Sequence, residues 1–88
     1  MKNTKNILKT KPIKIWEFRE YPKGSLLENG IVLNETGIFI YKLCNGRRTV
    51  REIVKKILEE YEVDQRKAEA DTVRCIKELL TTGSIKLK

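Results

Sequence analysis

Histidine is absent from the 88-residue sequence. The residue that most often serves as a general base and as a metal ligand is therefore missing. Cysteine is scarce as well, since Cys44 and Cys75 are the only two, and they lie in unrelated contexts that fit neither a zinc site nor a disulfide framework. We therefore expect a cytoplasmic protein that is not an enzyme, with no catalytic residue, no metal site, no cofactor and two buried, reduced thiols.

Long apolar runs are missing too. No stretch approaches the roughly 18–20 apolar residues that span a bilayer, and the lysine-rich N-terminus lacks the apolar segment of a secretory signal. We therefore expect no membrane partner. Apolar residues still make up 40% of the sequence, which is enough for one small hydrophobic core.

Positive charge is in excess, with a formal net charge of +7 at pH 7. Five lysines and no acidic residue fall within residues 1–14, whereas the rest of the chain is close to balanced. Blocks of like charge are usually unstructured. We therefore predict that residues 1–12 form a disordered basic tail, and that the excess charge lies there rather than on a folded face. A weak electrostatic tether to an acidic partner is the alternative role for this tail.

The first half of the chain beyond this tail has strand character. Aromatic and β-branched residues predict a strand over Ile13–Tyr21, and a second follows over Ser25–Glu28. Asn29-Gly30 predicts a type I′ hairpin turn, because both of its central positions need a positive φ. A third strand is predicted over Ile31–Leu33, which completes an antiparallel meander.

The hydrophobic period then changes from that of strands to that of helices. Asn34 is a suitable N-cap for a helix that ends at Asn45-Gly46. Thr49 and Glu52 form a capping box for a second helix, whose apolar residues between Val50 and Tyr61 recur at helical spacing.

Asp64 can cap a third helix that runs to about Thr82, with Gly83 as its terminator. Residues 84–88 alternate, and they either add an edge strand or fray. The predicted fold class is α+β and winged-helix-like, with a three-stranded antiparallel sheet followed by three α-helices in one domain over residues 13–88.

One stretch carries a resemblance to a known family. Leu33-Asn34-Glu35-Thr36-Gly37, then Ile40, then Leu43-Cys44-Asn45-Gly46-Arg47-Arg48-Thr49-Val50 is similar to the PqqD-like family, also called RiPP recognition elements. Gly37 stands where the family usually has Ala, and Asn45 where it usually has Asp. Neither change conflicts with the fold, because glycine costs roughly 0.5–1 kcal/mol in a helix and Asn still hydrogen-bonds in a turn.

The resemblance implies a peptide-binding module without catalytic residues. Such domains bind the leader segment of a ribosomally synthesised precursor peptide and present it to a modifying enzyme, often a radical S-adenosylmethionine (SAM) enzyme. The leader adds as an extra strand to the third strand, beside the third helix. The residues expected to bind it are Ile31, Val32 and Leu33 of the strand and Arg66, Ala70, Val73, Arg74 and Lys77 of the helix.

Approximate energies indicate which contacts must supply the affinity for the leader. A leader strand might form ~4–6 backbone hydrogen bonds of roughly 1 kcal/mol each, while ordering the peptide costs about 1–2 kcal/mol per residue. The affinity must therefore come from apolar side chains buried in the groove. Arg66, Arg74 and Lys77 are expected to pair with leader carboxylates and to set its orientation.

A winged-helix DNA-binding regulator is the alternative function. Its recognition helix should be basic, whereas the predicted third helix carries balanced charges, so nucleic acid is not the expected partner. A monomer and a strand-exchanged dimer both remain open.

Overall fold

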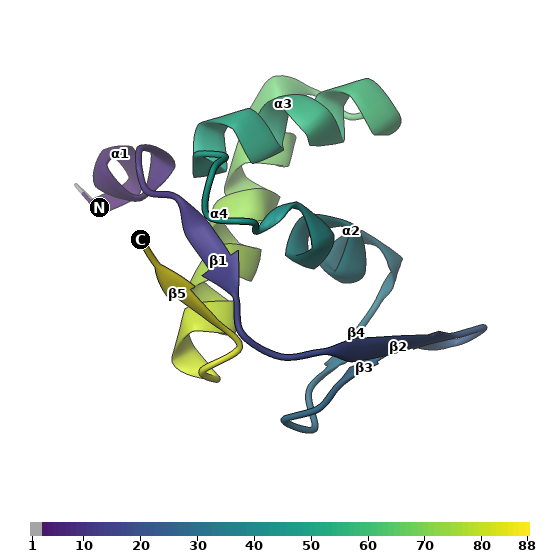
Figure 1. Ribbon diagram of the computed structural model, residues 1–88. Coiled ribbons are helices and arrows are strands. Elements are labelled where there is room, and N and C mark those ends of the chain that lie inside the picture. Colours follow the sequence, from purple (N-terminus) through teal and green to yellow (C-terminus); the bar gives the residue numbers. More distant parts are fainter. Residues whose placement is uncertain (1–2) are drawn as a thin grey trace.

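Two small antiparallel sheets and four helices make up residues 3–88, which the computed structural model describes, with side chains from residue 6 onward (Figure 1). In chain order the elements are α1 (Asn3–Leu8), β1 (Pro12–Lys14), β2 (Phe18–Tyr21), β3 (Gly24–Leu27), β4 (Val32–Leu33), α2 (Glu35–Leu43), α3 (Val50–Glu60), α4 (Gln65–Thr81) and β5 (Ile85–Leu87). The predicted α+β class, a three-stranded antiparallel sheet followed by helices, is confirmed.

The predicted strand Ile13–Tyr21 is wrong, because this stretch divides between two sheets. β1 pairs with β5, so a segment near the start of the chain lies beside one near its end (Figure 1), and β2 pairs with β3. The residues between β1 and β2 find other partners. The backbone N–H of Trp16 donates to the Tyr41 hydroxyl at 2.9 Å, and that hydroxyl donates to the Trp16 carbonyl at 2.7 Å. A buried side chain therefore replaces a strand partner at Trp16.

The predicted disordered tail is also absent from residues 3–12. Residues 3–8 form α1, and its Ile7 and Leu8 side chains are buried in the core. Pro12 then begins β1. The lysines between these apolar residues lie on the surface, so a basic segment can fold when its few apolar residues reach a core. Residues 1 and 2 of the predicted tail lie outside the described residues.

β2, β3 and β4 form the second sheet in that order, with Leu26 opposite Val32 in the β3–β4 pair. A turn occurs at Asn29-Gly30 as predicted, but it is not type I′. Gly30 has φ +92°, whereas no residue other than glycine has a positive φ in the described chain. Asn29 therefore keeps an ordinary backbone, and its side chain is free to reach Ser84 near the end of the chain.

The predicted helix caps are confirmed. Asn34 Oδ1 accepts from the Gly37 N–H at 2.8 Å, and Asp64 Oδ1 accepts from the Lys67 N–H at 2.7 Å. Thr49 and Glu52 form both hydrogen bonds of a capping box. Each bond satisfies a backbone N–H that the helix itself leaves free.

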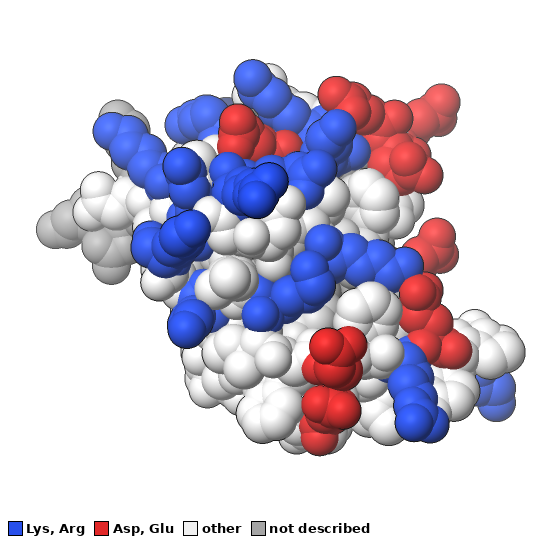
Figure 2. Space-filling view, viewed as in Figure 1, with Lys and Arg blue, Asp and Glu red and all other residues white. Residues whose placement is uncertain are grey.

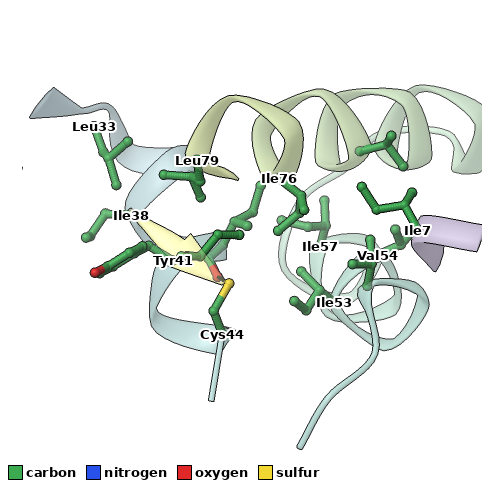
Figure 3. Packing of buried hydrophobic residues seen from close by; sticks show 14 of the residues in the cluster. Ile7, Leu33, Ile38, Tyr41, Cys44, Ile53, Val54, Ile57, Ile76 and Leu79 are labelled. Atoms are coloured by element: carbon green, nitrogen blue, oxygen red, sulfur yellow. Dashed lines mark hydrogen bonds between the residues drawn. The ribbon is translucent and has the colours of Figure 1, made fainter. Parts of the chain in front are cut away.

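The core lies where α2, α3 and α4 meet (Figure 3). α3 contributes its apolar stripe, including Ile53, Val54 and Ile57, against Ile76 of α4. Ile7 of α1 covers one end of this cluster, and Leu33 of β4 lies at the other (Figure 3). This packing fixes α4 relative to β4.

Candidate functional site

β4 is an edge strand with one free side. It pairs with β3, and among residues 3–88 no other strand pairs with it. The C-terminal strand β5 pairs with β1 and leaves this edge uncovered. The Val32 side chain is 69% exposed, which is unusual for a large apolar residue and marks the edge as accessible.

The backbone groups of Val32 face the free side. The Leu27 N–H donates to the Ile31 carbonyl at 2.9 Å across the β3–β4 pair. Because hydrogen-bonded and non-hydrogen-bonded pairs alternate in antiparallel strands, the next pair, Leu26–Val32, points its backbone groups away from each other. The N–H and C=O of Val32 are thus available to a further strand.

A hollow of about 340 Å³, which we call the β4–α4 groove, runs beside this edge. Its wall on one side comes from β4 and the start of α2, and on the other from α4. The residues that line it are Val32, Leu33, Asn34, Thr36, Gly37, Ile40, Asp71, Arg74, Cys75 and Glu78.

Gly37 allows the start of α2 to pack closely against β4. A Cβ atom on Gly37 would lie 3.1 Å from Asn34 Oδ1 and 3.3 Å from the Cβ of Leu33. An alanine at this position would require these neighbours to move by a few tenths of an ångström. Glycine therefore brings the α2 N-terminus to the bottom of the groove.

The α4 wall of the groove carries both signs of charge. Asp71 forms ion pairs with Arg74 and with Lys67, each at 3.2 Å. Glu78 forms no ion pair with any described residue. The carboxylate of Glu78 is thus free to pair with a lysine or arginine side chain of a peptide in the groove.

A hydrogen-bond network joins the β3–β4 turn to the residues that follow α4. The Asn29 side chain donates to Ser84 Oγ at 3.1 Å, which fastens the β3–β4 turn to the residues that follow α4. Thr82 Oγ1 and Ser84 Oγ extend this network at 2.7 Å. These three residues do not line the groove, so the network holds the turn in place without entering it.

A second, larger hollow of about 930 Å³ follows the solvent side of α4, and we call it the outer hollow. Among the residues whose side chains the structure describes, all that line it belong to α4 or to its C-cap, Thr82. Arg74 and Glu78 line both hollows, so the two meet along this edge of the helix.

The predicted binding residues divide between these hollows. Val32, Leu33 and Arg74 line the β4–α4 groove, and Ile31 packs half-buried against the core without lining it. The other four line the outer hollow instead: Arg66, Ala70, Val73 and Lys77. The structure therefore does not bring these four together with the strand edge.

Sequence reasoning missed most of the groove. The missed residues are Asn34, Thr36, Gly37 and Ile40 around α2 and Asp71, Cys75 and Glu78 on α4. The spacing of Asp71, Cys75 and Glu78 places them on one flank of the helix. That signal was present in the sequence, but nothing there indicated which flank of α4 faces β4.

The two thiols are weak nucleophiles at neutral pH. Burial raises the pKa of Cys44 to about 12 and that of Cys75 to about 11. At neutral pH both are thiols, and a thiol is a poor nucleophile. Cys75 contributes an inert apolar surface to the groove.

Two other kinds of feature are absent from the described residues. No group of three or more acidic or cysteine side chains among them is placed to hold a metal ion. None of the helices in residues 3–88 has the length and apolar character to cross a bilayer.

Comparison with known proteins gives one match. Residues 22–85, more than half of the chain, match the family described as coenzyme PQQ synthesis protein D (PqqD). Searches of curated proteins and of solved structures gave no match. The match begins after β2 and ends at the start of β5, and it includes every residue that lines the groove. The chain therefore belongs to the PqqD family, the PqqD-like RiPP recognition elements.

Proposed function

We propose that this protein binds the leader segment of a ribosomally synthesised precursor peptide and presents it to a modifying enzyme such as a radical SAM enzyme. The leader adds as a strand to β4 and lies in the β4–α4 groove. Membership of the PqqD family supports this function. The observation that carries the binding mode is the free edge of β4 beside the β4–α4 groove.

The short strand limits what backbone bonding contributes. β4 has two residues, and only Val32 turns its N–H and C=O to the free side. A bound leader thus gains about two ladder bonds of roughly 1 kcal/mol each, fewer than the four to six expected for a longer edge. The rest of the affinity must come from leader side chains that pack against Val32 and Cys75 and from leader charges that pair with Arg74 and Glu78 in the groove.

The protein's part is binding and orientation. The described residues include no histidine, and both thiols are protonated at neutral pH. The chemistry therefore belongs to the enzyme that receives the peptide. A cytoplasmic setting agrees with this role, because precursor and enzyme are made there.

The test begins with a displayed library of the N-terminal segments of all short reading frames in the source genome. The natural precursor need not be identified before such a selection. We expect the library to enrich one leader family that binds in the micromolar range. Hydrogen exchange should show that the Val32 amide becomes protected when the peptide is bound.

Two matched variants at one position then test strand addition. Val32→Pro removes the free amide donor, and Val32→Thr keeps it with a side chain of the same shape. We expect Val32→Pro to lose at least about tenfold in affinity, and Val32→Thr to lose about threefold or less. Equal binding by Val32→Pro would exclude β4 as the docking strand. Leu33→Asp is not a clean test, because Leu33 belongs to the core and a carboxylate there would unfold the domain.

A further inference from the structure

Lysine and arginine side chains from three separate segments gather on one face of the molecule. Figure 2 shows them as a band across the face that carries α1, β1 and the start of α3. We call this surface the basic face and define it by Lys9, Lys11, Arg47, Arg48, Arg51, Lys55 and Lys88.

Backbone hydrogen bonds bring the three segments together. The Thr10 carbonyl accepts from the Val50 N–H at 3.0 Å, and the Pro12 carbonyl accepts from the Gly46 N–H at 2.9 Å. The Lys88 N–H donates to the Lys11 carbonyl at 2.9 Å. The basic residues are thus held on a folded frame, whereas the sequence suggested a loose tail for the first of them.

One carboxylate, that of Glu52, lies near Lys11 and Lys55 and balances the charges of the basic face only in part. The ion pairs among the described side chains use Lys42, Lys56, Lys67 and Arg74, none of which belongs to this face. Glu52 is the one acidic residue within the contributing segments, and its carboxylate accepts from the Thr49 N–H at 2.8 Å. The face therefore keeps a strong positive potential.

We propose that the basic face binds the phosphate backbone of nucleic acid without reading its sequence. Arginine and lysine bind phosphate oxygens through charge-assisted hydrogen bonds, and this contact needs no apolar anchor. A protein partner would need one, because binding energy at protein interfaces concentrates in buried aromatic and apolar side chains. Among the described residues, the exposed large apolar side chains nearest in sequence to this face include Leu87, beside Lys88, and Ile15, which follows β1.

The same structure argues against sequence reading. α4, which would be the recognition helix of a winged-helix protein, carries balanced charges and does not contribute to the basic face. None of the seven basic residues lines the β4–α4 groove. Nucleic acid binding is therefore independent of the peptide site, and the two functions can fail separately.

Fluorescence anisotropy with two unrelated DNA duplexes of about 20 base pairs tests the proposal, in salt between about 50 and 200 mM. For about four phosphate contacts we expect the affinity to fall about 100-fold over this range. The two duplexes should bind equally well. No binding at about 50 mM salt would overturn the proposal.

Two double variants with the same change in net charge test whether DNA binding depends on the basic face or only on the overall charge of the protein. Arg47→Glu combined with Arg51→Glu should lower the affinity at least about tenfold. Arg19→Glu combined with Lys23→Glu, on the β2–β3 hairpin, should lower it about threefold or less. Equal losses in both variants would remove the assignment to this face.

Two controls complete the experiment. Circular dichroism checks that the variant with Arg47→Glu and Arg51→Glu is folded. If it is unfolded, a variant with Lys9→Glu and Lys88→Glu takes its place, and we expect the same loss of DNA affinity. A poly-glutamate peptide serves as the protein-like competitor. If it binds as tightly as DNA of equal charge, the partner is an acidic polypeptide and the proposal is wrong.

Discussion

The two sides of α4 differ in what they offer a peptide. The β4–α4 groove is smaller, but it combines a helix with a strand edge whose Val32 amide and carbonyl are free. The outer hollow is larger, yet within the described part of the chain only α4 and its cap line it. A helix satisfies its own backbone hydrogen bonds, so the outer hollow presents only side chains. The size of a hollow is therefore a poor guide to where a chain in extended conformation docks.

Two tryptophan substitutions give the largest expected contrast between these sides. Thr36 is exposed on the α2 side of the groove, and Ala70 is exposed in the outer hollow. Thr36→Trp should fill the groove and lower leader affinity by about 100-fold or more. Ala70→Trp should change it about twofold or less. Calorimetric titration of the selected leader measures both, and the opposite order would place the peptide in the outer hollow.

Val73→Ala tests whether the outer hollow serves folding or binding. Val73 lines this hollow but is 6% exposed, so most of its side chain packs in the core. Its truncation should lower the free energy of unfolding by about 2 kcal/mol in urea denaturation. Leader affinity, measured where both proteins are folded, should stay unchanged. A clear loss of affinity would show that the peptide contacts this side.

Cys75 reports on the groove side through its reactivity. With a pKa raised by burial to about 11, its thiolate fraction at pH 8 is small, and alkylation should be about 100-fold slower than in the denatured protein. The rate should rise about tenfold per pH unit until the pH nears this pKa. Mass spectrometry of the alkylated protein measures the rate at Cys75. Bound leader should slow Cys75 further, and an unchanged rate would contradict groove binding.

Arg74→Ala should give the smallest effect, because Arg74 lines both sides and is exposed. Its ion pair with Asp71 contributes about 0.5 kcal/mol or less to stability. Leader affinity should fall about threefold to fivefold at low salt, and less at high salt. Lys67 pairs with the same carboxylate but lines neither hollow, so Lys67→Ala is the matched control. Equal losses of leader affinity in Arg74→Ala and Lys67→Ala would show that the effect comes from Asp71, the ion-pair partner that both residues share.

Sequence reasoning succeeded where the interactions are local. Asn34, Thr49 and Asp64 cap their helices as predicted, because each side chain bonds to a backbone N–H three residues away. It failed at the turn type of Asn29-Gly30, where the Asn29 side chain bonds to Ser84. That bond joins residues 55 positions apart, and no local propensity contains it.

The candidate site shows the same division. Val32 and Leu33 were identified correctly as strand residues at a free edge, since the meander pattern and the turn signal are local. The α4 side was predicted less well. Helical periodicity separates the buried face from the exposed one, but it does not distinguish the flank toward β4 from the outer flank. Only the packing of α4 against α2 and α3 makes that distinction.

The sequence by itself determined the order of the elements from β3 to α4, the caps of the helices, the apolar stripe of α3 and the resemblance to the PqqD family. Each of these depends on residues within a few positions of one another. Tertiary structure alone decided that the N-terminal segment folds against the C-terminal strand, that three distant segments form one basic face, and that Asp71, Cys75 and Glu78 face β4. The reason is that such pairings follow from how the whole chain buries its apolar surface, and this leaves no periodic signature in any one segment.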